Sequence, residues 1–372
     1  DSGILDLDGN KTELRFPSLL RDPLVLEKIN GALSWGIRKD GTWHIDTTDM
    51  VALTKDINTR TRLTMEFPAP NQTDIPVFMD LQTDFSDGAA GSTSRYLPVG
   101  IMPNKVVDWL DKSIIGGKII SGSCIFRGPL KGFPFHKTQK GRFEVFFHTE
   151  DLALDYWPGW PRLESVNATV RFLNNSFDTW MEQGKLLDSR LRHAHGHIER
   201  LSEGSPFELT GVADGPLKDE LRILSESPLA ARFGPLVKGM RGVGDARLAM
   251  EFAVPIKTPA PHRLNGTLTF QDSELHLDDW GLALTGIRGD LLFDLKGVKG
   301  KGIRANTLDG EIRLDIGTPE KRPNTTRVSA AGEIPSEALA KKFPGMGLHY
   351  LKGSARWDFL MDIPKTSASQ DT

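Results

Sequence analysis

Three histidines at alternate positions have the residue type and spacing that come nearest to a metal site. On a strand, His193, His195 and His197 would project from one face at steps of about 6.6 Å, and a His-x-His pair can chelate zinc when another strand supplies a further ligand. Cys124 or an acidic side chain would have to be that ligand. Because arginines flank the triplet and no second cluster completes the set, a solvated outer face is the favoured interpretation and no structural metal is expected.

The other candidates for chemistry fit turns and surfaces better. The glycine clusters at 239–244 and 297–302 lack the strand-to-helix context and the Lys-Ser/Thr ending of a phosphate loop, so turns are expected there. Asp219-Glu220 and Asp278-Asp279 are adjacent carboxylates. On a strand they would point to opposite faces, which suits the surface and not a catalytic pair. The sequence contains no serine-hydrolase, zinc-protease or kinase motif, so neither enzymatic activity nor a cofactor is predicted.

Alternation of apolar and polar residues dominates the chain and predicts β-strands, for example over 246–254 and 312–316. Turn residues at Lys39-Asp40-Gly41, Asn265-Gly266 and Leu308-Asp309-Gly310, with Gly297 to Gly300, predict short connections and so antiparallel neighbours. The alternation places the following residues on a common apolar face: Leu63, Met65, Phe67, Phe143, Val145, Phe147, Leu248, Met250, Phe252, Leu291, Phe293, Leu295, Ile312, Leu314, Ile316, Trp357, Phe359 and Met361.

Helical spacing covers about a tenth of the chain and predicts short helices after Pro103 and over Pro216–Ser225, Pro228–Phe233 and Pro335–Phe343. The 37 glycines and 23 prolines among 372 residues likewise favour many turns over long helices. A net charge of −3 without a basic stripe argues against a nucleic-acid groove. The single cysteine excludes a disulfide framework within the chain.

A weak internal repeat follows the predicted helices. Gly122, Gly244 and Gly353 each begin a long amphipathic strand that comes after a helix and a Gly-rich hinge. A sheet with one apolar face must bury that face, and so few helices cannot cover some twenty strands. The face therefore closes on itself as a sandwich or barrel, or stays partly open as a groove for an apolar ligand.

The aromatic stretch Tyr156-Trp157-Pro158-Gly159-Trp160-Pro161 has two interpretations. The favoured one is a rigid loop whose indole rings close one end of a sheet. The alternative is a contact with a lipid headgroup or a membrane interface.

Several strings in the middle of the chain resemble the YhdP-type members of the AsmA-like family. In order, they are Tyr96-Leu97-Pro98, Trp109-Leu110-Asp111, the run GPLKGFPF from Gly128 to Phe135, Gly141-Arg142-Phe143 and Gly159-Trp160-Pro161. The resemblance is strong from about residue 90 to 260 and weaker but compatible on either side.

The resemblance implies a large Gram-negative envelope protein that conducts phospholipids from the inner toward the outer membrane. It implies a mainly β fold: an elongated, twisted antiparallel sheet curved into a hydrophobic groove, built from repeated helix-plus-strand units. The apolar set above would line that groove against phospholipid acyl chains. The family has no catalytic residues to carry over.

On this interpretation the chain is a periplasmic segment of a protein anchored in the inner membrane. The chain starts without Met and with an alternating pattern already under way, so part of a longer protein is expected upstream. Contacts with both membranes would lie in parts absent here, envelope proteins are possible partners, and nucleic acid is not expected. The alternative function is a non-catalytic scaffold or protein-binding module with a filled core, acting in envelope assembly.

Three segments and a tail are expected. They are an N-terminal β-meander over 1–95, the central segment with the family strings over 96–256, a C-terminal β-repeat segment over 257–364 and a disordered tail over 365–372.

Overall fold

The computed structural model describes residues 2–137, 140–255, 263–346, 350 and 352–364. Its eighteen strands belong to one antiparallel sheet that does not close into a barrel, accompanied by a few short helices. Unit 1 consists of Asp1–Trp157, Arg162–Gly184 and His195–Ser205, and unit 2 of Pro158–Pro161, Lys185–Ala194 and Pro206–Thr372. The three expected segments stay a prediction. Their boundary at 256/257 and the tail over 365–372 lie outside the described residues.

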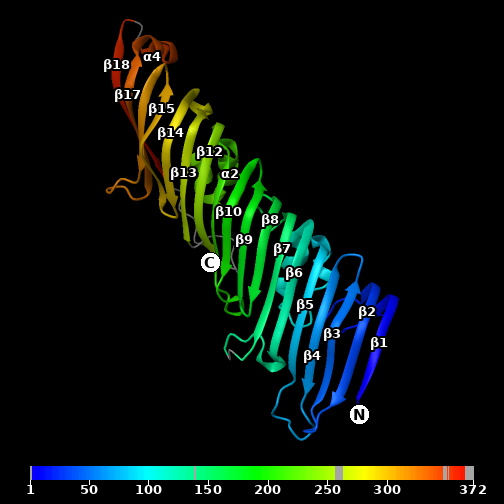
Figure 1. Cartoon of the computed structure of the whole chain (residues 1–372). Helices are drawn as coiled ribbons and strands as arrows, with labels where there is room; N and C mark the ends of the chain where they lie inside the picture. Colours follow the sequence, from blue (N-terminus) through cyan, green and yellow to red (C-terminus); the bar gives the residue numbers. More distant parts are fainter. Residues whose placement is uncertain (1, 138–139, 256–262, 347–349, 351, 365–372) are drawn as a thin grey trace. The chain divides into compact units, whose positions relative to one another are not determined.

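Unit 1 is an antiparallel meander in which each strand from β1 to β8 pairs with the next one along the chain (Figure 1). Its short helices are η1 (Ala90–Arg95), α1 (Asn104–Ser113), η2 (Leu130–Gly132) and η3 (Leu201–Glu203). Its strands are β1 (Ser2–Leu14), β2 (Leu24–Ile37), β3 (Trp43–Leu53), β4 (Asn58–Phe67), β5 (Phe78–Ala89), β6 (Ile114–Pro129), β7 (Arg142–Leu154) and β8 (Leu163–Leu173). The hairpin of β9 (Ser176–Leu186) and β10 (Ser189–Ile198) contributes to both units.

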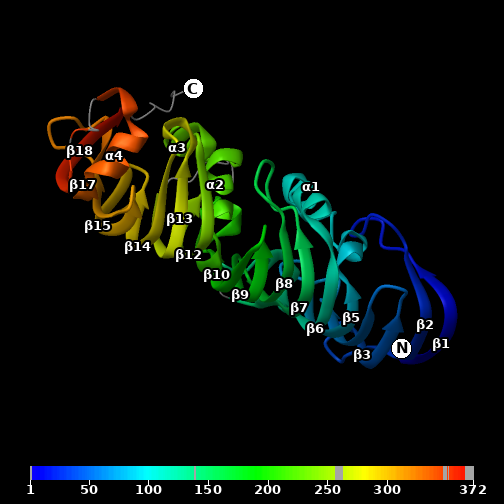
Figure 2. The same cartoon turned by 90° about the horizontal axis from the view of Figure 1, so that it is seen from above.

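Unit 2 repeats this meander with consecutive pairing from β11 to β18. Its helices are α2 (Leu217–Glu226), α3 (Ala230–Val237), η4 (Asp278–Trp280), α4 (Ser336–Lys342) and η5 (Pro344–Met346). Its strands are β11 (Phe207–Pro216), β12 (Met240–Val254), β13 (Arg263–Leu277), β14 (Leu282–Asp294), β15 (Gly297–Thr307), β16 (Gly310–Gly317), β17 (Thr325–Pro335) and β18 (Ser354–Pro364). Figure 2 shows α2 and α3 against one face of the neighbouring strands β12 and β13.

The helix-plus-strand order occurs three times, once before every sixth strand. The helix α1 precedes β6, α2 and α3 precede β12, and α4 precedes β18. Gly244 and Gly353 share a left-handed backbone, with φ of 78° and 98°. Gly122 is not among the left-handed glycines. Its missing side chain instead makes room for the Phe85 ring, because a Cβ there would lie 2.5 Å from that ring.

Two of the expected turns are wrong. Asn265-Gly266 lies inside β13, and Gly297 to Gly300 begins β15. Gly266 serves close packing and not a bend, because the Phe293 ring fills the place of its missing side chain, 2.1 Å from where a Cβ would be. Most of the 239–244 cluster likewise lies in β12, with only Gly239 before it. The turn at Leu308-Asp309 is confirmed, with both residues left-handed as a two-residue hairpin requires.

The two units differ in how much apolar surface they bury. In unit 2 one cluster of buried residues spans β14 to β17 and includes Ile303 and Ile312, with Trp357 and Phe359 of β18 packed against it. The corresponding cluster of unit 1 is small, consisting of Ala90, Leu152, Val166 and Ala168. The largest fully buried side chain of unit 1 belongs to Phe135, in the β6–β7 connection.

Replacing Phe135 by Ala is expected to lower the free energy of unfolding of unit 1 by about 3–5 kcal/mol, because it leaves a cavity where the ring was fully buried. The matched control is Phe133→Ala, since Phe133 is 38% exposed and two residues away. Hydrogen exchange of β6 and β7 amides against denaturant measures both variants. Equal losses in the two variants would contradict the assignment of Phe135 as the anchor of this connection.

Candidate functional site

The pairing register gathers the apolar residues of unit 1 on one face of its sheet. Leu63 pairs with Leu81, Leu81 with Phe126, and Phe126 with Phe143. Side chains of directly paired residues lie on the same face, so this row continues across four strands. The same registers place all six residues that the alternation selected in unit 1 on this face, namely Leu63, Met65, Phe67, Phe143, Val145 and Phe147.

The opposite face of unit 1 carries charges in ion pairs. Glu144 lies between Arg142 and Arg171, with oxygen–nitrogen distances of 2.5 and 2.8 Å, and Arg127 lies 3.6 Å from Asp80. These charges keep this face in water and leave the other face as the apolar one.

The six apolar residues of unit 1 are only half-buried. Neither of the two helices before β6 encloses them: η1 packs mainly on β6, and α1 has its few contacts with η1 and β6. The face is thus exposed in part although its side chains are large and apolar.

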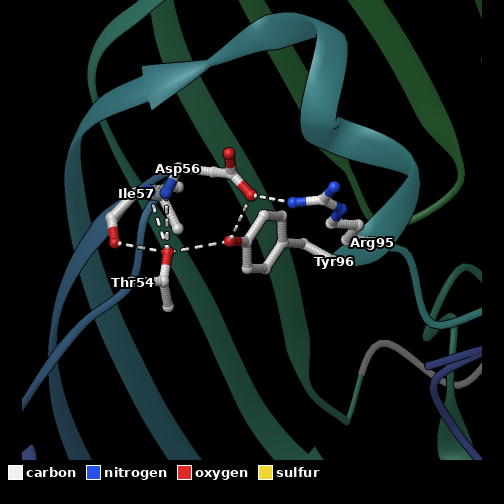
Figure 3. A network of polar contacts seen from close by, with 5 residues as sticks. All are labelled: Thr54, Asp56, Ile57, Arg95 and Tyr96. Atoms are coloured by element: carbon white, nitrogen blue, oxygen red, sulfur yellow. Dashed lines mark hydrogen bonds and ion pairs between the residues drawn. The ribbon is translucent and has the colours of Figure 1, made fainter. Parts of the chain in front are cut away.

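A polar clasp fixes the start of the long β5–β6 connection to the β3–β4 turn (Figure 3). Arg95 Nη1 lies 2.5 Å from Asp56 Oδ2, and the Tyr96 hydroxyl lies 2.8 Å from Thr54 Oγ1. Thr54 Oγ1 also accepts hydrogen bonds from the amides of Asp56 and Ile57, which orders the turn. Burial raises the pKa of Tyr96 above its ordinary value, so the hydroxyl keeps the proton that it donates.

The same connection then reaches the β1–β2 loop. The amide of Gly100 donates to the Leu19 carbonyl at 3.0 Å, and Arg21 donates to Asp111 of α1 at 2.7 Å. The connection is therefore tied to turns that lie two and four strands away from β5 in the meander, and it forms a fixed border along these strand ends.

Four phenylalanine rings border the other strand ends of unit 1. Phe133 of the β6–β7 connection stacks on Phe126 and lies edge-to-face with Phe143, at centroid distances of 5.9 and 5.2 Å. Phe135 meets Phe126 edge-to-face at 5.2 Å. Because Phe126 and Phe143 belong to the apolar face, this connection folds over the end of that face.

Cys124 lies on the apolar face between Thr83 and Val145. Burial raises the pKa of its thiol to about 11, so the sulfur is a neutral thiol at physiological pH. A neutral thiol is a poor nucleophile and a poor metal ligand. Cys124 thus acts as a small apolar residue of this face.

In unit 2 the register also places the selected residues on one face. Leu248 pairs with Leu268, and Leu268 with Leu291. Further along, Leu314 pairs with Ala330, and Ala330 with Phe359. By the same registers the face contains Leu248, Met250, Phe252, Leu291, Phe293, Ile312, Leu314, Ile316, Trp357, Phe359 and Met361. Leu295 follows the last residue of β14 and packs with Phe293 in one cluster.

Helices of the same unit pack on part of the apolar face of unit 2. Ile223 of α2 and Phe233 of α3 are buried against it, and Phe233 meets Phe293 at a centroid distance of 6.5 Å. At the far strands, Phe359 of β18 meets Trp280 of η4 edge-to-face at 5.5 Å. Two helices therefore pack on part of this face. Leu248, Ile312 and Leu314 are buried there, whereas the other selected residues of unit 2 are half-buried, as those of unit 1 are.

A family model described as YhdP protein matches residues 1–372. The chain belongs to the YhdP family. The intermembrane phospholipid transporter YhdP of Escherichia coli (strain K12) is 21% identical over 361 residues, which are 96% of this chain and 28% of that protein. The chain thus spans little more than a quarter of that relative's length. No solved structure matches the chain. None of the helices in the described ranges has the length and apolarity that crossing a bilayer requires.

The strings that carry the YhdP resemblance have structural roles in this chain. Tyr96 closes the clasp on the β3–β4 turn, and Asp111 holds the β1–β2 loop. Trp109 Nε1 donates to the Tyr156 carbonyl at 2.9 Å, and Trp160 packs beside the cluster that contains Phe233. These residues fix the connections that border the apolar faces, and they form no catalytic constellation.

Asp219 and Glu220 correct one prediction, because they are buried on a helix and are not surface residues. They lie in the first turns of α2 and are 0% and 4% exposed. Asp219 Oδ2 accepts hydrogen bonds from the Asp188 amide and the Ser189 hydroxyl, both at 2.8 Å. Burial, and next the charge of Asp219, raise the pKa of Glu220 to about 7. The helical spacing of apolar residues from Leu217 to Ile223 could have predicted that these two carboxylates lie on a helix and not on a strand.

The histidines divide into a pair and a single residue. His195 Nε2 and His197 Nδ1 lie 3.3 and 2.8 Å from Asp178 Oδ1, and the Trp180 ring stacks on His195. His193 is exposed, and its left-handed backbone, with φ of 51°, interrupts the alternation that would align all three. In the part of the chain that the structure describes, no three His, Cys, Asp or Glu side chains form a group that could hold a metal ion. The absence of a structural metal stays a prediction.

Glu220→Gln is expected to make the protein more stable above pH 7 and less sensitive to pH. The folded protein holds the Glu220 proton up to a pKa of about 7, whereas the ordinary pKa of a glutamate side chain is 4.5. The folded state therefore binds more protons between these values, and its stability falls as pH rises through them, by on the order of 3 kcal/mol. Denaturant unfolding at pH 5 and pH 8 measures this fall. A fall of unchanged size in the variant would contradict the assignment to Glu220.

Proposed function

We propose that unit 1 holds phospholipid acyl chains on its apolar face, as part of a protein that moves phospholipids between the two membranes of a Gram-negative envelope. One observation carries the proposal: large apolar side chains, aligned by register across β4 to β8, remain half-buried between two fixed borders. The name of the Escherichia coli relative supports the choice of phospholipid.

The physical reason is that an apolar face binds a hydrocarbon chain without any specific bond. Each buried CH₂ contributes about 0.8 kcal/mol. Because Leu63, Cys124 and Val145 offer similar contacts, an acyl chain can move along the face at little cost. A headgroup keeps its water at the open side, so the proposal requires no charged partner on the face.

The proposal includes a periplasmic location, with anchoring to the inner membrane and contacts with both membranes through other parts of the protein. It includes a non-catalytic role, which fits side chains that serve packing and clasps. Protein partners in the envelope belong to the same proposal.

A second candidate function applies to unit 2. Part of its apolar face is a filled core, with Ile303 and Ile312 only 1% and 3% exposed. A filled core fits a scaffold or protein-binding module in envelope assembly, as the sequence also allowed. The chain can combine the two roles, one in each unit.

Val145→Asp is expected to remove most of the phospholipid that copurifies with the chain while changing its thermal midpoint little. The new carboxylate would interrupt the apolar row but, on a half-buried face, would reach water. Phe146→Asp is the matched control, because Phe146 pairs with Ser123 and Arg171 on the opposite face. Extraction and mass spectrometry measure the lipid. A wild-type chain without phospholipid, or equal loss in both variants, would contradict the proposal.

Cys124 gives a test that needs no change to the apolar face, because it is the one cysteine of the chain. Removing lipid from the purified chain is expected to speed alkylation of Cys124 by a neutral maleimide, and adding phospholipid back to slow it again. The control is Ser123→Cys in a Cys124→Ser chain, whose thiol lies on the opposite face. If lipid slows both thiols equally, or neither, acyl chains do not occupy this part of the face.

A further inference from the structure

We propose that the hairpin of α2 and α3, residues Leu217–Val237, is a displaceable plug that must leave the apolar face of unit 2 before acyl chains can occupy it. This inference rests on the proposed function, since it concerns the same kind of apolar face. It assigns to the hairpin control over whether acyl chains reach the apolar face of unit 2.

The plug lies over residues that the alternation of apolar and polar residues predicts to line the groove. Ile223, Leu229 and Phe233 are buried in one cluster with Leu264 and Val298 of the sheet. Four predicted lining residues of β12, β14 and β16 pack against the same cluster, namely Met250, Phe252, Phe293 and Ile316. An acyl chain on these residues and the plug would exclude each other.

Among the described elements, the connections before β6 and β18 pack differently from the α2–α3 hairpin before β12. The helix α1 contacts η1 and β6, and α4 contacts β17 and η5. Their residues do not occur among the buried residues of the clusters on the apolar faces, except for Ala90 of η1. The α2–α3 hairpin is thus the connection whose buried side chains lie on the proposed lining.

A buried carboxyl weakens the seating of the plug. Glu220 lies on the buried side of α2, and its Oε1 is buried without a hydrogen-bond partner among the described residues. Burying a polar group without a partner costs free energy, and this cost applies to the position in which the hairpin is seated on the sheet. The closed position is therefore less stable than its apolar contacts alone would make it.

The ends of the hairpin suit a hinged movement. The first turn of α2 is held to the β9–β10 turn, because Lys218 Nζ lies 2.6 Å from Asp188 Oδ2 and Asp219 accepts from Ser189. At the other end Gly239, with φ of 70°, joins α3 to β12. The helices have ten and eight residues, neither N-cap makes a side-chain hydrogen bond, and α3 contains Pro235. Helices this short depend on packing for their stability.

The test locks the plug and asks where lipid goes. In a Cys124→Ser chain, Phe233→Cys and Phe293→Cys are bridged by a cleavable thiol reagent that spans the space between the two rings. A photoreactive residue replaces either Phe252, which the plug covers, or Val145 on the face of unit 1, and the chain is incubated with phospholipid vesicles. The bridge is expected to abolish lipid labelling at 252 and leave labelling at 145 unchanged. Cleaving the bridge is expected to restore labelling at 252.

The control bridge joins Thr269→Cys to Asp290→Cys, a pair of β13 and β14 whose native side chains hydrogen-bond at 2.7 Å. It staples two strands without touching the plug, so labelling at 252 is expected to persist. The plug proposal is wrong if position 252 is labelled equally with and without the Phe233–Phe293 bridge. It is also wrong if position 252 is labelled neither before nor after the bridge is cleaved while position 145 is labelled. Absence of labelling at 145 in every sample overturns the proposed function instead.

Discussion

The structure depends on the antiparallel register, which repeats every two residues and makes directly paired side chains share a face. From Leu63 across to Phe143, and from Leu248 across to Leu291, every pairing step joins two apolar residues. A slip of one residue at any strand would bring charged residues such as Glu144 to the apolar face. Each unit therefore has one apolar and one charged face.

What covers the apolar face is decided by the connections and not by the strands. In unit 1 the long connection after β5 is tied to the strand ends by Asp56 and Asp111, and it borders the face without filling it. In unit 2 the connection after β11 folds onto the face as α2 and α3. Similar strands thus give a face without helices packed on it in unit 1 and a face partly covered by helices in unit 2. This difference makes lipid binding the natural proposal for unit 1 and regulated access the natural proposal for unit 2.

Two buried carboxylates hold these connections in place. Asp56 accepts from Arg95, and Asp219 accepts from the turn at Asp188 and Ser189. Glu220 is different, since no hydrogen bond to its carboxyl offsets its burial, which raises its pKa to about 7.

The order of apolar and polar residues is enough to predict which side chains of a strand share a face, because alternation is a local property and the pairing preserves it. The positions of α1 to α4 are predictable for the same reason, since proline entries and helical spacing are local too. The depth to which each residue is buried depends instead on contacts between distant parts of the chain. The contacts of Phe233 with Phe293 and of Trp280 with Phe359 join residues about 60 to 80 positions apart. Gly266 likewise depends on a distant residue: its local sequence predicts a turn, but its role is to make room for the Phe293 ring. The burial of Asp219 and Glu220 depends in the same way on where α2 packs.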